Sequence, residues 1–137
     1  MLNHKSPLHF LLLPVAILLF GMVLSSCDTA TKGKVEVVNA ATVATQLSTP
    51  NLQLVDVRTA DEFAQGTIKG AVNIDIKETT TFKDKMEQFD KNKPVYIFCQ
   101  AGGRSKKAAT QLLEMGFTTI YDFSGGYSTW SSQHNNQ

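Results

Sequence analysis

The chain has 137 residues, of which 42% are hydrophobic, and its thirteen Lys and Arg residues nearly balance twelve Asp and Glu residues. Nucleic-acid-binding proteins usually show a basic surplus, so this composition excludes that class. The length suits one compact domain behind an N-terminal leader.

The first 26 residues have the layout of an export signal. Lys5 precedes an apolar run at 10–24, and two serines then lead to Cys27. A spanning helix needs about 20 apolar residues, so the run favours a cleaved signal over an uncleaved signal anchor. The junction resembles the bacterial lipobox, in which the cysteine becomes the lipidated first residue. We therefore expect a signal peptide at 1–26 and a lipoprotein anchored through Cys27 on the periplasmic side of a bacterial membrane.

The chain that follows the leader is poor in reactive side chains. Segment 27–34 reads as a lipidated N-terminus with a polar tether, and without Lys5 the rest of the chain has zero net charge, twelve basic against twelve acidic residues. Cys99 is then the single free thiol and His134 the single histidine. These counts exclude an intramolecular disulfide, a Cys-His hydrolase whose base is held by the fold, and a zinc site.

The first predicted elements are two strands and a helix between them. A β-branched run at 35–38 precedes Asn39, a suitable N-cap for a helix with Val43 and Leu47 on one face. The apolar run at 52–57 predicts a strand that is buried on both faces.

A capping box marks the second helix. Thr59 and Glu62 have its T-x-x-E spacing, and Gly66 can close the short helix that follows. Residues 71–74 predict a third strand. The next helix is amphipathic and stops before Pro94. Its inner face is expected to consist of Phe82, Met86 and Phe89.

The last third of the chain predicts two further strands, each followed by a helix. The strands lie at 95–98 and 118–121, and the helix between them at 105–115. Gly125 and Gly126 form a turn before a short final helix. The inner face of the 105–115 helix is expected to consist of Ala108, Leu112 and Met115. Gly116 is its expected C-cap. The aromatic residues expected in the core are Phe98, Phe123 and Trp130. Alternating strands and helices predict an α/β fold with a central parallel five-stranded sheet and helices on both faces.

Cys99 follows the fourth strand, at the edge where such sheets form their sites. The flexible residues after it let the backbone aim its N–H groups inward, and a helix beginning at Ser105 adds partial positive charge. This arrangement binds anions and favours the thiolate of Cys99. Lys106 and Lys107 add positive potential on the first turn. The loop residues expected to form the site are Gln100, Ala101, Gly102, Gly103, Arg104 and Ser105.

Three ordered segments carry a family resemblance. They read LVDVRTADEFAQGTIKGAVNID at 54–75, CQAGGRS at 99–105, and a closing stretch at 116–130 that ends in GGYSTW. The chain is similar to a single-domain rhodanese, with the domain at 35–132 and a polar tail at 133–137. The resemblance implies the rhodanese-like fold and a sulfurtransferase that works without a cofactor.

The resemblance also implies a mechanism and partners. Cys99 would accept a sulfane sulfur as a persulfide from thiosulfate or a similar donor and pass it to cyanide or a thiol, including a thioredoxin-like protein thiol. Asp56 and Arg58 match the D-x-R element and would support the site. Thr67 stands where the family often has histidine. We expect this difference to affect local packing more than activity. We expect a monomer that meets the membrane only through its lipid.

Two alternatives remain open at this point. A phosphatase or arsenate reductase also surrounds an anion with cysteine and arginine, but its loop reads C-x5-R, whereas this loop reads C-x4-R. The shorter ring of amides suits a sulfur atom better than a phosphate, and Asp122 is a candidate general acid only by elimination. The second alternative is a membrane-tethered persulfide carrier or redox interaction module that uses the same loop.

Overall fold

The computed structural model describes residues 32–134. The predicted signal peptide, the lipidation at Cys27 and all but the last residues of the tether lie outside these residues and stay predictions. The longest described helix has twelve residues, and none of the helices in this part of the chain has the length and apolar character needed to cross a membrane.

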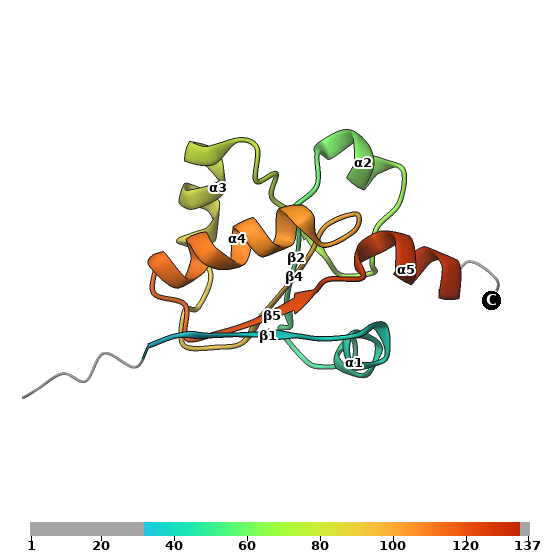
Figure 1. Cartoon of the computed structure of the whole chain (residues 1–137), viewed down its shortest axis with the longest axis horizontal. Coiled ribbons are helices and arrows are strands. Elements are labelled where there is room, and N and C mark those ends of the chain that lie inside the picture. The colour runs from blue at the N-terminus through green and yellow to red at the C-terminus, as the bar shows by residue number, and fades with distance from the viewer. Residues whose placement is uncertain (1–31, 135–137) are drawn as a thin grey trace, which may run out of the picture. The chain divides into compact units, whose positions relative to one another are not determined.

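A five-stranded parallel sheet forms the centre of the domain (Figure 1). Its spatial order is β1-β5-β4-β2-β3, and each neighbouring pair is parallel, as the sequence predicted. The strands are β1 (Lys34–Val37), β2 (Gln53–Asp56), β3 (Val72–Asn73), β4 (Val95–Phe98) and β5 (Thr119–Phe123). Because β4 lies in the middle of the sheet, its carboxyl end is flanked by the ends of β2 and β5.

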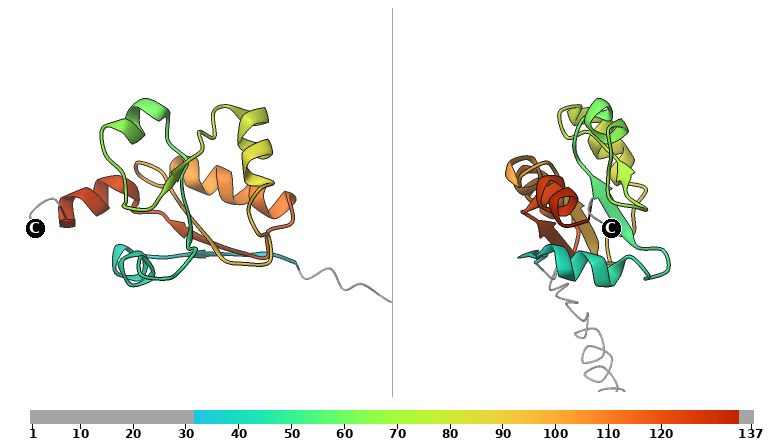
Figure 2. Two further views of the ribbon diagram at one scale, coloured as in Figure 1. Left: turned by 180° about the vertical axis from the view of Figure 1, so that it is seen from behind. Right: turned by 90° about the vertical axis from the view of Figure 1, so that its right-hand side faces the viewer.

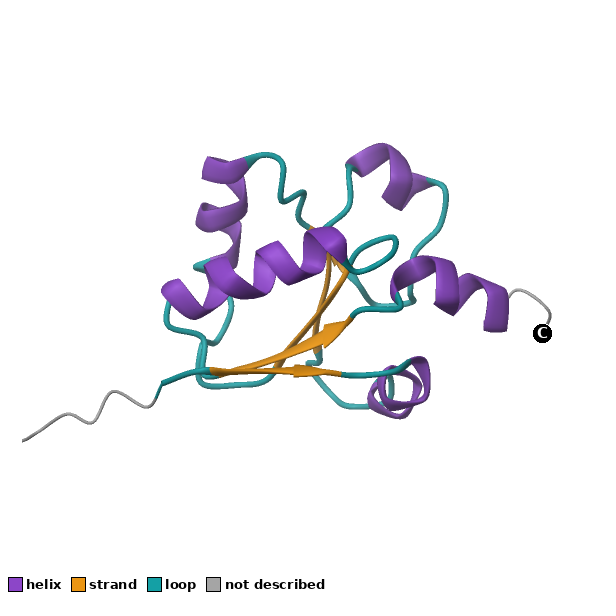
Figure 3. Ribbon diagram, in the orientation of Figure 1, coloured by secondary structure: helices purple, strands orange, loops and turns teal. Residues whose placement is uncertain are grey.

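Helices cover both faces of the sheet, as expected (Figures 2 and 3). Helices α3 and α4 cover one apolar core that includes Val55, Ile97 and Ile120. Helices α1 and α5 cover the other, which includes Phe98 and Phe123. The helices are α1 (Ala40–Gln46), α2 (Ala60–Ala64), α3 (Thr79–Met86), α4 (Gly103–Glu114) and α5 (Gly126–His134).

Local signals placed several element ends correctly. The Asn39 side chain accepts a hydrogen bond from the N–H of Thr42, 2.9 Å away, so the predicted N-cap is confirmed. Thr59 and Glu62 form both bonds of the predicted capping box. The predicted C-cap Gly116 is off by one residue, because Met115 is the C-cap of α4 and Gly116 follows it with φ +91°. Each signal acts within a few residues, which is why the sequence alone reveals it.

Other boundaries differ from the prediction. Helix α4 begins at Gly103, two residues before Ser105, because Gly102 takes the left-handed conformation that ends the loop. Helix α3 ends at Met86, and Phe89 lies beyond it, because the Gln53 side chain binds both the N–H and the carbonyl of Asp90. These contacts hold the turn before β4 in a non-helical form.

The two ends of the domain also differ slightly. Strand β1 is an edge strand shifted by one residue to Lys34–Val37, and all four of its residues are exposed. Helix α5 continues to His134, two residues into the segment expected to be a polar tail. The His134 ring stacks on Trp130 with a centroid separation of 3.9 Å. Trp130, Phe98 and Phe123 are buried, which confirms them as core residues.

Candidate active site

Cys99 lies directly after β4 at the carboxyl edge of the sheet, and only 2% of its surface is exposed. Val95 and Ile97 share its face of the strand and pack in the core under α4. The buried strand therefore fixes where the sulfur lies, and the loop after it determines what surrounds the sulfur.

The loop encloses Cys99 Sγ with polar hydrogens. The N–H of Gly102 donates a hydrogen bond to Sγ at 3.1 Å, and Ser105 Oγ lies 3.8 Å from the sulfur. Gly102 has φ +87°, a conformation that favours glycine, and it caps α4, whose first residue is Gly103. We call this ring of N–H and hydroxyl donors the cradle. The sequence predicted it, and the structure brings the loop and the start of α4 together around the sulfur.

The cradle favours the thiolate form of Cys99. Burial by itself raises the pKa of the Cys99 thiol, but the backbone N–H groups of Ser105, Ala101 and Arg104 and the Ser105 hydroxyl outweigh it, so the pKa is lowered. Hydrogen bonds to the charged form are the physical cause. A nucleophilic sulfur is thus available without a neighbouring histidine.

Helix α5 supports the same loop from its outer side. Because the loop turns its N–H groups toward the sulfur, the carbonyls of Cys99 and Gln100 face outward. They accept hydrogen bonds from the N–H of Tyr127 at 2.8 Å and the N–H of Ser128 at 3.1 Å, two residues of the first turn of α5. Gly126 must approach closely here, since a Cβ on it would lie 2.4 Å from the carbonyl oxygen of Cys99. The sequence indicated only a turn at this glycine.

Arg104 forms a two-pronged ion pair with Glu62. Both of its terminal nitrogens lie 2.6 Å from a Glu62 carboxylate oxygen. The sequence included Arg104 among the loop residues of the site but did not indicate this partner on α2. Lys106 and Lys107 stay exposed on the first turn of α4. The loop end is therefore tied to α2, and the exposed cations nearest the cradle come from α4.

Asp56 and Arg58 form a buried pair under the loop, 0% and 2% exposed. The guanidinium bonds both carboxylate oxygens of Asp56, the shortest at 2.7 Å, and also the carbonyl of Gly66 at 2.6 Å. Its Nη1 donates to the Gln100 side chain at 3.1 Å. Thr67 donates to Asp56 at 2.9 Å. The pair thus connects β2, the segment after α2 and the cysteine loop, which is a supporting position.

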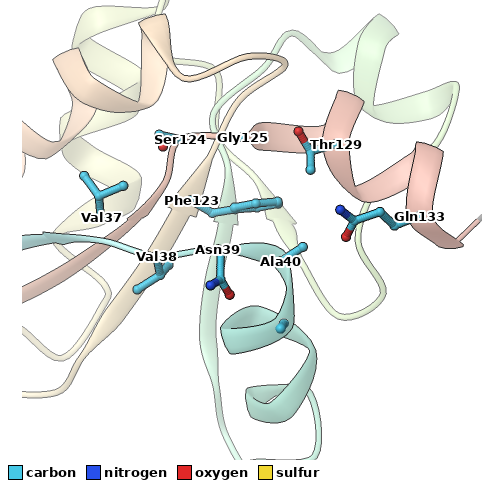
Figure 4. Close-up of a pocket in the computed structure, with 10 residues that line it drawn as sticks. Val37, Val38, Asn39, Ala40, Phe123, Ser124, Gly125, Thr129 and Gln133 are labelled. Atoms are coloured by element: carbon cyan, nitrogen blue, oxygen red, sulfur yellow. The ribbon is translucent and has the colours of Figure 1, made fainter.

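Several hollows lie near the carboxyl edge of the sheet. One of about 320 Å³ is polar and is lined by Arg58, Glu62, Gln65, Gln100, Tyr127 and Ser131. A second of about 560 Å³ lies between the ends of β1 and β5 and helices α1 and α5, and Figure 4 shows Phe123 crossing it and Gln133 at its side. The second hollow includes no residue of the 99–105 loop. A third of about 610 Å³ is lined by Ala101, Gly102 and Gly103, so the first and third hollows are the openings that border the cysteine loop.

Gly102 and Gly103 offer a matched pair of substitutions. Gly102→Ala should destabilise the protein by about 2 kcal/mol or more, because φ is positive and the new Cβ would lie 2.5 Å from the Ser124 carbonyl oxygen. Gly103→Ala meets no atom within 4 Å and should be neutral or stabilising by up to about 1 kcal/mol. Urea denaturation measures both, and equal stability of the two variants would contradict the proposed loop geometry.

Because of the Glu62–Arg104 pair, the free energy of unfolding should depend on pH in the acid range. Hydrogen bonds from Arg104, and then from Thr59, lower the pKa of Glu62 from 4.5 to about 2. The carboxylate therefore stabilises the fold above pH 4.5, and this contribution is lost as the pH falls toward about 2. Glu62→Gln should lower the free energy of unfolding by about 1 kcal/mol at neutral pH and by less near pH 2. Glu87→Gln, in a more exposed pair with Lys91, is the control. A loss that does not depend on pH would argue against the pair.

Comparisons with known proteins agree with this architecture. The chain is 37% identical over 101 residues to thiosulfate sulfurtransferase 16 of Arabidopsis thaliana, covering 67% of this chain and 84% of that one. It is 31% identical over 84 residues to thiosulfate sulfurtransferase GlpE of Coxiella burnetii, covering 61% and 76%.

The chain is also similar to a solved structure and to a family of domains. The human single-domain sulfurtransferase TSTD1 superposes with a TM-score of 0.62 at 26% identity, covering 72% of this chain and 96% of that one. The Rhodanese-like domain family matches residues 39–133, which is more than half of the chain. The parallel sheet, the cysteine loop at its carboxyl edge and this match together place the chain in the rhodanese-like domain family.

Proposed function

We propose that this protein is a sulfurtransferase that carries a sulfane sulfur on Cys99. The observation that carries the proposal is the ring of N–H groups around the buried sulfur of Cys99, which stabilises a negative charge on that atom. Relatives named thiosulfate sulfurtransferase support the same chemistry. Thiosulfate or a similar donor is the proposed first substrate.

The reaction has two steps. In the first, the Cys99 thiolate attacks the outer sulfur of thiosulfate, the sulfur–sulfur bond breaks, and sulfite leaves with the electron pair. In the second, a nucleophilic acceptor such as cyanide or a thiolate attacks the outer sulfur of the persulfide. The Cys99 thiolate then leaves with the electron pair, and the N–H groups that stabilised it at the start stabilise it again.

The surroundings of the loop suit a small or exposed acceptor. The polar hollow of about 320 Å³ borders Gln100, the first loop residue, and is large enough for a small anion or the tip of a protein side chain. Lys106 and Lys107 attract anions to this end of the sheet. A protein thiol, such as that of a thioredoxin-like partner, is a second proposed acceptor, and a dedicated carrier role would use the same persulfide.

Phosphoryl transfer is less well supported. The residue suggested as its general acid, Asp122, is only 4% exposed. A general acid must meet the leaving group of a bound substrate, and so deeply buried a carboxyl offers little surface for that contact.

The test is incubation of the purified protein with thiosulfate, followed by measurement of released sulfite and of intact mass. The expected result is one added sulfur atom per chain, removed again by cyanide with release of thiocyanate. Absence of the adduct would contradict the proposal, and turnover of an aryl phosphate in its place would favour the phosphatase alternative. An adduct that passes only to a protein thiol would indicate the carrier role.

A further inference from the structure

Strand β1 forms one edge of the sheet, with β5 as its single neighbour in the described part of the chain (Figure 1). The backbone N–H groups of Lys34 and Val38 donate to carbonyls on the β5 side. Because N–H groups alternate in direction along a strand, those of Val35 and Val37 point away from β5. Their carbonyls point the same way, so the outer edge of β1 offers unpaired donors and acceptors to another strand.

The same edge also exposes apolar side chains. Val35 and Val37 are 39% and 70% exposed, and they are two of the three large hydrophobic residues exposed in the described part of the domain. With Lys106, Ala109 and Thr110 they line the third hollow, so they lie on the face of the sheet that α4 covers. The edge of β1 therefore combines unpaired backbone groups with an apolar surface, which is typical of a binding site for another strand.

The other two side chains of β1 carry opposite charges. Lys34 and Glu36 form an exposed salt bridge, and by alternation along the strand they lie on the face away from the two valines. Edge strands that stay single are usually blocked by lysine, proline or a bulge. In β1 a positive and a negative charge lie two positions apart, so an identical strand running the other way can meet each charge with its opposite. An edge that is complementary to itself suits a two-fold pair of identical chains.

We propose that two copies of this protein pair through antiparallel β1 strands, with Val35 of each copy opposite Val35 of the other. The two Val35 residues exchange backbone hydrogen bonds, and Val37 of each copy does the same with Gly33 of the other. Lys34 of each copy then faces Glu36 of the other at a non-hydrogen-bonded position, where side chains lie closer together. The two five-stranded sheets thereby join into one continuous sheet.

The charges of β1 select this register over its neighbours. A shift by one residue brings the outward N–H groups of one copy opposite groups that point away, so the backbone hydrogen bonds are lost. A pair centred on Lys34 or on Glu36 keeps these bonds but places like charges directly opposite each other, which is destabilising. A pair centred on Val37 would place Val35 opposite Asn39, which caps α1 beyond the end of the strand.

The pairing places both copies of α4 on the same face of the joined sheet, because residues opposite each other share a face. The second copy then lies along the side of the third hollow that Val35 and Val37 line. The inference goes beyond the proposed function and does not depend on it, since none of the paired residues belongs to the cysteine loop. From the sequence we expected a monomer, and the unpaired, self-complementary edge of β1 is the observation that favours a dimer.

The first measurement is disulfide cross-linking by oxidation in air, in a Cys27→Ser background where Cys99 is the remaining native thiol and is buried. In Val35→Cys the two Cα atoms are about 5.5 Å apart, inside the range of about 4.4–6.8 Å that a disulfide bridges. In Val37→Cys they are about 14 Å apart, because each lies four residues from the other along the pair. Val35→Cys should therefore give a dimer on a non-reducing gel. Val37→Cys, which is more exposed, and Val72→Cys on the opposite edge strand should not.

The second measurement is the molar mass of the purified protein by light scattering at increasing concentration. Wild type should approach the mass of two chains. At the same concentrations Lys34→Glu and Glu36→Lys should each shift to the mass of one chain, because each variant places like charges opposite each other. An equal mixture of the two variants should regain the mass of two chains, since every charge then faces an opposite one. Thermal unfolding of each variant shows that the comparison is between folded proteins.

Each outcome decides the question. Equal cross-linking of Val35→Cys and Val37→Cys would indicate chance collisions and overturn the inference, as would the absence of a dimer in Val35→Cys. A wild type with the mass of one chain, single charge variants that remain dimeric, or a mixture that stays monomeric would also overturn it. Sulfur loading from thiosulfate is read separately by intact mass, so its failure in a dimeric protein would reject the proposed function alone.

Discussion

Cys99→Ser should remove sulfur uptake completely and lower thiosulfate turnover by at least about 10³-fold, the order of loss seen when a covalent nucleophile is deleted. A serine hydroxyl is not ionised at neutral pH, so the N–H groups that stabilise the sulfur anion find no charge to bind. The variant should stay folded, because Ser differs from Cys by one atom and the cradle still offers hydrogen bonds to an oxygen. The measurements are sulfite release and intact mass after incubation with thiosulfate.

The chain contains its own matched control for this variant. Cys27→Ser changes the other cysteine, which lies outside the described residues, and should leave sulfur uptake by Cys99 unchanged. A sulfur adduct that survives in Cys99→Ser, or one that is lost in Cys27→Ser, would assign the chemistry to a different atom. The pair of variants therefore separates loss of the Cys99 sulfur from an effect of changing the other cysteine of the chain.

Arg58→Ala should destabilise the fold by about 3–5 kcal/mol, the range for breaking a buried ion pair. Asp56 is fully buried and faces the guanidinium of Arg58 through three nitrogen–oxygen contacts of 3.1 Å or less. Without the guanidinium its charge is left uncompensated, and the carbonyl of Gly66 loses a donor. The Tyr127 ring, whose centroid lies 4.3 Å from the guanidinium carbon, loses its cation as well. Urea denaturation at neutral pH measures the loss.

Two further variants test the physical origin of this loss. Arg58→Lys keeps the charge but loses the planar fork, so it should recover only part of the stability. Lys91→Ala removes one partner of a partly exposed surface ion pair and should cost less than about 1 kcal/mol. Similar losses in Arg58→Ala and Lys91→Ala would show that burial of the Asp56–Arg58 pair does not set its contribution.

The sequence revealed the parts of this fold that depend on near neighbours. The N-cap at Asn39 and the capping box at Thr59 join residues three positions apart, so their residue types are sufficient to predict them. Strand β4 was predicted with its correct bounds, because a run of four apolar residues after Pro94 is typical of a buried strand. The end of α3 was misplaced, since its position depends on Gln53, 37 residues away from Asp90.

In the candidate site, too, the sequence revealed the local features and missed the contacts between distant residues. The loop from Cys99 to Ser105 is contiguous, so its glycines and the helix after it predicted a cradle for an anion. The contacts that hold the loop come from elsewhere. Glu62 is 42 residues from Arg104, and the first turn of α5 is 28 residues from the carbonyls that it binds. Gly126 was the available signal for the second contact, but a glycine before a helix is equally typical of an ordinary turn.

The sequence by itself determined the position of the loop cysteine, the length of its loop and the alternation of strands and helices, because each is encoded in consecutive residues. The tertiary structure alone decided that Arg104 binds Glu62 and that α5 supports the loop carbonyls. These pairings bring together residues from different elements, and the order of strands in the sheet sets their distances. A parallel sheet gathers the ends of separate strands at one edge, and no local pattern records which side chains will meet there.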